Sequence, residues 1–322
     1  MKQIVIGIDT SCYTTSVAAS TLDGQLICSC RKLLPVTAGE RGLRQSDAVF
    51  LHIRQIPKLL EDVFMQINGF QVAGICVSTR PRNSDDSYMP VFSVGKTIAE
   101  TLSISLNAPV IETDHQHGHF AAAVYESSID PGKGYIALHL SGGTTDMVLI
   151  DGNRFEMLGT SLDLHAGQLI DRTGVALGLG FPAGPELEKL ASKGKTKAII
   201  PSSLTDDGMS CHLSGAEAAC IRMIRDKNIS ESDLASEVFD CLSRTTAKMT
   251  LNAVRQTGFL QVLLAGGVSS SLLFREMFTE RIRKGNRNIH VCFGHPQYSG
   301  DNAAGVALIG ADHLRNKESE RK

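Results

Sequence analysis

The sequence predicts an α/β protein built from two similar halves. Three observations support this prediction: a strand, loop, strand, turn, strand pattern occurs at residues 3–30 and again at 134–158, helices follow each copy, and a strand at 261–265 leads through a glycine pair into a helix. A length of 322 residues agrees, because a chain of this size usually forms about two domains.

The first copy opens the chain. An apolar strand at 4–8 runs into a loop of small polar residues, 9–16, and a second strand follows at 17–19. An Asp23-Gly24 turn then leads into a third strand at 25–30. Apolar segments separated by such turn residues are typical of antiparallel strands.

The second copy has the same order, with strands at 135–140, 147–150 and 154–158 and an Asp151-Gly152 turn. Its loop, 141–145, consists of glycine and hydroxyl residues. Such a loop between buried strands leaves backbone N–H groups free and lets a phosphate approach closely. A tight hairpin without a ligand is the alternative interpretation of either loop.

Apolar residues at helical spacing predict the helices that follow each copy. In the first half we expect helices at 48–67, with a kink at Pro57, and at 94–106. In the second half we expect them at 167–176, 183–192, 234–256 and 272–284.

Two further segments complete the chain. A strand at 72–77 leads into a polar run, 78–88, which we expect to form a mobile loop. The charged tail after residue 313 is expected to fray.

The composition, with 42% hydrophobic and 20% charged residues, is typical of a globular protein. A net charge of -2 and a pI near 6.6 exclude a strongly basic surface over the whole molecule, so an RNA partner requires a local basic patch. No segment has the apolar length of a signal peptide or a membrane helix. Eight scattered cysteines without a C-x-x-C motif predict reduced thiols. We therefore expect a cytoplasmic protein that does not contact a membrane.

Two histidines, His115 and His119, stand four residues apart at the predicted start of a helix. Side chains at i and i+4 share a helix face, so both imidazoles can bind one metal, whereas His117 points elsewhere. A histidine pair without a ligand is the alternative until a third, acidic ligand is found. Asp301, which precedes a small-residue helix, is the candidate acid, although capping that helix is the usual role of such an Asp.

A series of motifs, in order from residue 3 to about 312, resembles the tRNA threonylcarbamoyladenosine transferase (TsaD) family, once called Gcp or O-sialoglycoprotein endopeptidase. The matching stretches are Asp9-Thr10-Ser11-Cys12, His115-x-x-x-His119, Ser141-Gly142-Gly143-x-Thr145, the GLGFPAGP run within 167–185, Leu213-Ser214-Gly215, Gly266-Gly267-Val268 and Asp301-Asn302-Ala303-Ala304.

The resemblance implies a two-lobed actin/Hsp70/sugar-kinase-like (ASKHA) fold with duplicated ribonuclease-H-like halves. One lobe, 1–130 with 298–322, is expected to carry the metal site. The other, 131–297, is expected to carry the nucleotide-binding motifs.

The resemblance also implies that His115, His119 and Asp301 hold one catalytic metal, iron or zinc, in a cleft between the lobes. Two imidazoles and a carboxylate leave coordination positions open, which suits a catalytic site. His139, two residues before the Ser-Gly-Gly motif, stands where some family members have a tyrosine at the metal. His139 is therefore a candidate fourth ligand; the alternative is an inward-facing strand residue.

Adenine nucleotide or an acyl-adenylate is the implied ligand of the second lobe. The positions that match the family's nucleotide contacts are Ser141, Gly142, Gly143, Thr144, Asp163, Gly167, Asp171, Gly180, Gly184, Gly267 and Ser271. Asp163 and Asp171 are expected to hold ribose hydroxyls; the alternative is that both are surface acids at a helix start.

In this family the metal binds the threonylcarbamoyl group of threonylcarbamoyl-adenylate, and the exocyclic amine of adenosine 37 in tRNA attacks its carbonyl. This is an acyl transfer, in which the metal polarises the carbonyl and the adenylate leaves. The implied partners are tRNA and either TsaB-like or TsaE-like proteins or a second copy of the chain.

Departures from the family pattern concentrate at the site. Tyr13 and Thr14 replace two acids after Cys12, which removes carboxylates available to a general base. A polar run at 80–88 replaces a glycine-rich segment. Three single positions also differ: Thr144 replaces a histidine, Leu164 an acid and Ser271 an asparagine. This pattern predicts a divergent paralogue that keeps the metal and nucleotide sites.

Three functions stay open. They are the family's tRNA modification, a related metal-dependent carbamoyl or acyl transfer to another acceptor, and a nucleotide-binding scaffold subunit of a modification complex. A sugar-kinase-like activity is disfavoured because the histidine pair has no role in phosphoryl transfer. An endopeptidase is disfavoured because the pair lacks the Glu of an H-E-x-x-H helix.

Overall fold

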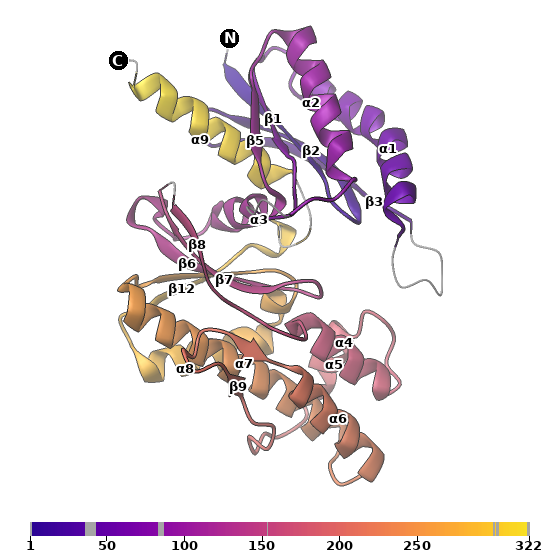
Figure 1. Cartoon of the computed structure of the whole chain (residues 1–322), viewed down its shortest axis with the longest axis vertical. Coiled ribbons are helices and arrows are strands. Elements are labelled where there is room, and N and C mark those ends of the chain that lie inside the picture. The colour runs from indigo at the N-terminus through magenta and orange to yellow at the C-terminus, as the bar shows by residue number, and fades with distance from the viewer. Residues whose placement is uncertain are drawn as a thin grey trace. The chain divides into compact units, whose positions relative to one another are not determined.

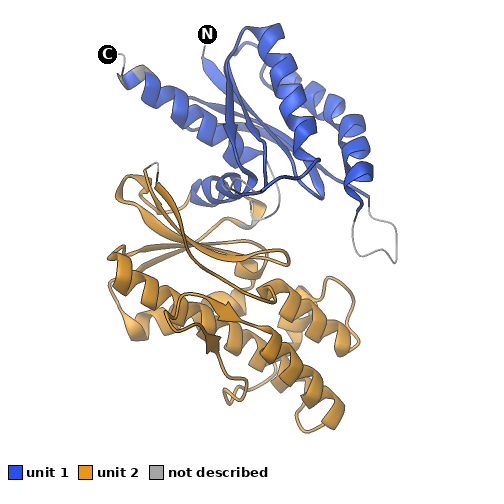
Figure 2. Cartoon of the chain, viewed as in Figure 1, with its two compact units in different colours: residues 1–125, 300–322 blue, residues 126–299 orange. Residues whose placement is uncertain are grey.

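The computed structural model describes residues 2–35, 43–82, 87–152, 154–298, 300 and 303–320. Contacts divide the chain into two compact units, residues 1–125 with 300–322 and residues 126–299 (Figure 2). These bounds lie within a few residues of the two expected lobes, whose status as domains stays a prediction. Asp301 and residues 83–86 of the expected mobile loop lie outside the described residues.

The first unit contains a five-stranded sheet in the order β3-β2-β1-β4-β5. Its strands are β1 (Gln3–Thr10), β2 (Thr14–Thr21), β3 (Leu26–Leu33), β4 (Gln71–Ser78) and β5 (Val110–Thr113). The first three strands are antiparallel, and β4 and β5 continue the sheet in parallel with β1. The predicted three-stranded repeat unit thus forms one side of the sheet.

Helices cover both faces of this sheet (Figure 1). They are α1 (Gln45–Gln66), α2 (Phe92–Leu106), α3 (His115–Val124) and α9 (Ala304–Glu320). Alternation along β1 explains the two layers: Ile4, Ile6 and Ile8 belong to the core shared with α1 and α2, whereas Val5 packs with residues of α9. Helix α1 continues through Pro57.

The second unit repeats the sheet as β12-β11-β6-β7-β8. Its strands are β6 (Tyr135–Leu140), β7 (Thr145–Asp151), β8 (Arg154–Thr160), β11 (Gln261–Ala265) and β12 (His290–Phe293), and a small hairpin comprises β9 (Ser203–Leu204) and β10 (Cys211–His212). Strands β6 to β8 are antiparallel, and β11 and β12 run parallel to β6. The matching orders of the two five-stranded sheets confirm the predicted duplication.

The second unit is rich in helices (Figure 1). They are α4 (Ala166–Ala176), α5 (Gly184–Ala191), α6 (Ser214–Asp226), α7 (Glu231–Thr257) and α8 (Leu272–Gly285), with short 3-10 segments η1 (Pro131–Lys133), η2 (Val268–Ser270) and η3 (Pro296–Tyr298). Among the described helices of the chain, none is long and apolar enough to cross a membrane.

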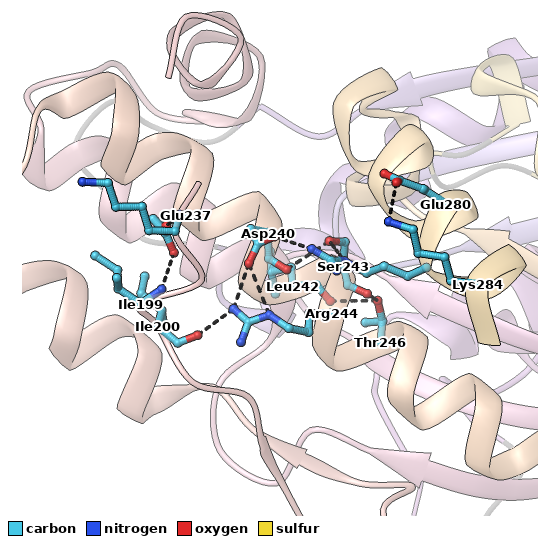
Figure 3. Close-up of polar contacts among 12 residues, drawn as sticks. Ile199, Ile200, Glu237, Asp240, Leu242, Ser243, Arg244, Thr246, Glu280 and Lys284 are labelled. Carbon is cyan, nitrogen blue, oxygen red and sulfur yellow. Dashed lines mark hydrogen bonds and ion pairs between the residues drawn. The ribbon is translucent and has the colours of Figure 1, made fainter. Parts of the chain in front are cut away.

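Buried carboxylates on α7 hold its neighbours in place (Figure 3). Asp240 accepts hydrogen bonds from Arg244 (2.9 Å) and from Arg281 of α8, and Arg244 also donates to the Ile200 carbonyl (2.7 Å). Glu237, which is 1% exposed, accepts from the Ile199 amide (2.9 Å). Because buried charges require partners, these contacts fix the loop before β9 and helix α8 against α7.

The structure corrects one expectation and adds elements that were not predicted. The expectation that the tail after residue 313 frays is wrong. Helix α9 continues to Glu320, and Asp312 pairs with Arg315 one turn later. The additions include β5, α6 and β12. Strands β5 and β12 are four-residue strands whose stability comes from pairing with β4 and β11, a non-local contact.

Candidate metal and nucleotide sites

Helix α3 brings the predicted histidine pair together. Asp114 caps the helix by accepting a hydrogen bond from the His117 amide (3.0 Å), and its carboxylate also contacts His117 Nδ1. The Nε2 atoms of His115 and His119 lie 3.0 Å apart, with ring planes at 74°. The pair therefore presents two imidazole nitrogens to one point, while His117 faces its own cap.

Asp9 orients His115 from the neighbouring strand. Its side chain, at the end of β1, is fully buried, and both carboxylate oxygens lie 3.0 Å from His115 Nδ1. The Ser78 hydroxyl donates to the same carboxylate. Because an ionised carboxylate only accepts, Nδ1 carries the proton and His115 Nε2 keeps its lone pair for His119 or a cation. A carboxylate behind the imidazole is the usual support of a metal-binding histidine.

The donor set fits a divalent cation, but a third ligand is not among the described residues. No cluster of three His, Cys, Asp or Glu side chains within the described ranges is arranged to hold a metal. Asp9 contacts the far nitrogen of His115, so it supports a ligand. Helix α9 approaches the pair closely: a Cβ atom at Gly305 would overlap the carbonyl oxygen of Gly118, the residue before His119.

His139, the other predicted ligand, lies on β6 of the second unit. It is 6% exposed and pairs in register with Ala265 of β11 and Asp146 of β7. It therefore belongs to a different unit from the histidine pair, and its role as a metal ligand stays a prediction.

A buried polar network supports the loop between β1 and β2. His52 of α1 places Nε2 2.8 Å from the Ser11 carbonyl and Nδ1 2.8 Å from the Thr15 hydroxyl, which also lies 2.9 Å from Gln55 Oε1. Since a carbonyl only accepts, Nε2 carries the proton. Burial lowers the pKa of His52, against the opposing effects of the Ser11 bond and Asp9. The uncharged imidazole thus supports the loop through its contacts with Ser11 and Thr15.

The second unit contains a cavity of about 340 Å³. Seven predicted nucleotide-binding positions line it: Ser141, Gly142, Gly167, Asp171, Gly184, Gly267 and Ser271. Seven lining residues were not predicted: Ile170, Pro182, Pro185, Glu188, Phe239, Val268 and Ser270. The walls therefore combine backbone of glycine loops, two acids and an apolar surface.

Glycine packing shapes the polar side of the cavity. The Gly167 amide donates to the Ser141 carbonyl (2.9 Å), which brings α4 onto the loop between β6 and β7. A Cβ atom at Gly167 would lie 2.6 Å from the Gly142 nitrogen, so only glycine fits. By contrast, a Cβ atom at Gly142 or Gly267 would meet nothing within 4 Å. Such open backbone beside a helix start suits a phosphate.

Two acids stand at the cavity wall with one oxygen engaged. Asp171 Oδ1 accepts from the Ala183 amide (2.8 Å), and Glu188 Oε1 accepts from the Leu273 amide (2.9 Å). Within the described ranges no hydrogen bond reaches the second oxygen of either carboxylate, which suits a ligand hydroxyl or amine. Glu188 escaped prediction because its partner lies on α8, far along the chain, and no local motif marks it.

Four predicted nucleotide positions do not line the cavity: Gly143, Thr144, Asp163 and Gly180. Asp163 instead holds the start of α6, where Oδ1 accepts from the Leu213 amide (2.8 Å) and Oδ2 from the Ser214 hydroxyl. Burial opposes ionisation, but the bonds from Ser214, Leu213 and Leu164 outweigh it and lower the pKa of Asp163 to about 2. Both oxygens of its carboxylate accept hydrogen bonds from the start of α6. Its role toward a nucleotide stays a prediction.

Known proteins share both sequence and fold with the chain. Residues 41–308 match the family described as TsaD, tRNA N6-adenosine threonylcarbamoyltransferase. A relative of that name from Carboxydothermus hydrogenoformans is 31% identical over 316 residues, which cover 96% of this chain and 92% of the relative.

Solved structures resemble the whole chain at low identity. HypF from T. kodakarensis matches 98% of the chain with a TM-score of 0.66 and 13% identity; the chain spans 48% of its length. A ROK hexokinase from Thermus thermophilus has a TM-score of 0.54 and 16% identity, with 98% of this chain and 99% of the hexokinase covered. These neighbours confirm the expected actin/Hsp70/sugar-kinase-like fold.

Proposed function

Because the chain belongs to the tRNA N6-adenosine threonylcarbamoyltransferase family, we propose that it transfers a threonylcarbamoyl group from threonylcarbamoyl-adenylate to adenosine 37 of tRNA. Family membership makes the chain a transferase of the acyltransferase type. The observation that carries the proposal is the convergence of His115 and His119 on one point, with Asp9 behind His115. That arrangement suits a cation that polarises a carbonyl.

His115, His119 and Asp301 are the proposed ligands of one divalent metal, iron or zinc. The support for Asp301 comes from Gly305, which follows it by four residues in the chain. At Gly305, helix α9 packs closely on Gly118 of α3. When bound, the metal would supply Lewis acidity at the threonylcarbamoyl carbonyl. Asp9 keeps the proton of His115 on Nδ1, so that Nε2 is available as a ligand. His139 is retained as a candidate fourth ligand.

The cavity of the second unit is the proposed site of the adenylate. Open backbone at Gly142 and Gly267 would accept the phosphate, Asp171 and Glu188 the sugar hydroxyls, and apolar residues the base. In the transfer, the N6 amine bonds to the carbonyl carbon, the bond to the phosphate oxygen breaks, and the amine releases one proton. Contacts of Gly143, Thr144, Asp163 and Gly180 with the adenylate remain part of this proposal.

A second candidate keeps the same donor chemistry with a different acceptor. The observation that favours it is Tyr13, which is 47% exposed in the loop beside Asp9 at a position where the family resemblance leads us to expect an acid; Thr14, the other such position, begins β2 and is 2% exposed. A neutral loop changes the charge that an incoming acceptor meets. A scaffold without its own turnover is the third candidate.

Nucleoside mass spectrometry tests the proposal. Unmodified tRNA is incubated with the protein, ATP, threonine, bicarbonate, an adenylate-forming synthase and the candidate partner proteins, and threonylcarbamoyladenosine is measured. We expect product with the native chain and with His117→Ala, whose Nδ1 contacts the helix cap Asp114, and loss of at least about 10²-fold with His119→Ala.

Absence of product with the native chain, while a conventional family member succeeds in the same mixture, would reject tRNA as the acceptor. Hydrolysis of the adenylate by the native chain in that experiment would then favour the second candidate over a scaffold.

A further inference from the structure

A cysteine, a histidine and a serine meet at the edge of the second sheet. His290 and Cys292 are alternate residues of β12, so their side chains leave the strand on the same face. Cys292 Sγ lies 3.1 Å from His290 Nε2. Ser128, from the segment before β6, places its hydroxyl 2.9 Å from His290 Nε2 and 3.0 Å from Cys292 Sγ. The three polar atoms therefore form a closed triangle.

This triangle is separate from the sites described above. None of its residues lines the nucleotide cavity, and the histidine pair belongs to the other unit. In register, His290 pairs with Gln261 at the beginning of β11, whereas the cavity residues that this strand leads to, such as Gly267, follow its end. The transferase function proposed above leaves these three side chains without a role.

The hydrogen-bonding capacities of the triangle allow a thiolate to be stabilised by two donors. When the thiol proton moves from Sγ to His290 Nε2, the imidazolium N–H and the Ser128 O–H both become donors to the sulfur. The negative sulfur and positive ring then form a contact ion pair, the arrangement that activates cysteine nucleophiles. We propose that Cys292 is a reactive thiol that undergoes exchange with small-molecule disulfides, with His290 as its proton acceptor.

The exchange balances without a further reactant. The Cys292 thiolate forms a bond to one sulfur of the disulfide, and the disulfide's own sulfur–sulfur bond breaks. The departing thiolate takes the proton that His290 received from Cys292. The products are a mixed disulfide at Cys292 and one free small-molecule thiol.

Cys28 provides a matched control within the same chain. Cys28 and Cys292 are both 7% exposed. Burial and the neighbouring Cys30 raise the pKa of Cys28 to about 11, and burial raises the pKa of Cys76 to about 12. Such thiols hold almost no thiolate at neutral pH. A difference in reactivity between Cys28 and Cys292 is therefore not explained by exposure, and a variant at His290 is needed to assign it to the imidazole.

Modification of the folded native protein tests the proposal. The protein is treated with bis(2-hydroxyethyl) disulfide at pH 7, quenched with acid and digested, and the mixed disulfide at each cysteine is quantified by mass spectrometry over time. We expect Cys292 to react at least about tenfold faster than Cys28. Equal rates, or a slower rate at Cys292, would overturn the proposal without any substitution having been made.

Two variants test whether the faster reaction of Cys292 depends on His290 and Ser128. His290→Gln should slow Cys292 to about the rate of Cys28, and Ser128→Ala should slow it by a smaller factor, because only one donor to the sulfur is lost. The rates of Cys211 and Cys220, buried thiols of the second unit, unchanged from the native chain, show that the fold of that unit is intact. An undiminished Cys292 rate in His290→Gln, with Cys211 and Cys220 unchanged, would contradict the role of the imidazole.

Discussion

The two hairpin loops of the repeated units share a backbone hydrogen bond and differ in the side chains beside it. In the first, the Ser11 amide donates to the Thr14 carbonyl (3.2 Å); in the second, the Ser141 amide donates to the Thr144 carbonyl (2.8 Å). Two residues before the serine, the first hairpin has Asp9 and the second has His139. The duplicated fold thus places different side chains at equivalent positions.

The surroundings of the two loops explain how each is used. Ser11 is 2% exposed, and its carbonyl faces His52, so the first loop acts as a rigid support from which Asp9 orients His115. A Cβ atom at Gly142 would meet nothing within 4 Å, so the second loop leaves open backbone for the proposed phosphate. One unit builds its candidate site from side chains for a cation, and the other from backbone for an anion.

The largest expected effect is on the side-chain site. Asp9→Asn replaces the carboxylate behind His115 with an uncharged amide, which holds the proton on Nδ1 more weakly because it can also donate to that nitrogen. We expect metal affinity to fall by about 10–100-fold, measured by titration of the metal-free protein with Zn²⁺. Asp114→Asn is the matched control, because Asn also caps a helix. Equal losses in the two variants would show that the effect is not specific to Asp9.

The backbone site should respond to a single methyl group. Gly167→Ala places a Cβ atom 2.6 Å from the Gly142 nitrogen, so α4 must move away from the loop. We expect a loss of about 1–3 kcal/mol in the free energy of unfolding and about tenfold weaker binding of AMP by calorimetry. Gly215→Ala, at the start of α6 where nothing lies within 4 Å, is the control. Native AMP affinity in Gly167→Ala would contradict the proposal that the backbone of this loop binds the phosphate.

The loop support in the first unit should be sensitive to mild acid. Burial lowers the pKa of His52, so the unfolded chain binds a proton more readily than the folded chain. Stability from the neutral ring is therefore present above the unfolded pKa of about 6.5 and lost as pH falls below it. Urea unfolding at pH 7 and pH 5 should show a smaller pH effect in His52→Gln than in the native chain. His313→Gln, at an exposed position of α9, should retain the native pH effect.

The smallest expected effect concerns Asp163 in the second unit. Its pKa is lowered to about 2, so its stabilising contribution is present above the unfolded value of 3.8 and lost as pH falls toward 2. Asp163→Asn should reduce the steepness of acid unfolding in that window. The two units thus differ in acid sensitivity, and a native-like acid profile in Asp163→Asn would remove that difference.

Local features of the sites could be predicted from sequence, and non-local ones could not. The spacing of His115 and His119 predicts their convergence because a helix determines it over one turn. The role of Asp9 depends on β1 lying near α3, 106 positions along the chain, and only folding shows it. Asp171 was predicted at the cavity from the family resemblance, whereas Glu188, whose partner lies on α8, matched no motif.

Elemental analysis of purified protein is the most direct test of the proposal that the first unit holds a metal through its histidine pair. We predict about one equivalent of iron or zinc in the native chain and in His117→Ala, and loss of nearly all of it in His119→Ala and Asp301→Ala, with AMP binding unchanged in all four proteins. Undiminished metal in both His119→Ala and Asp301→Ala would contradict the assignment.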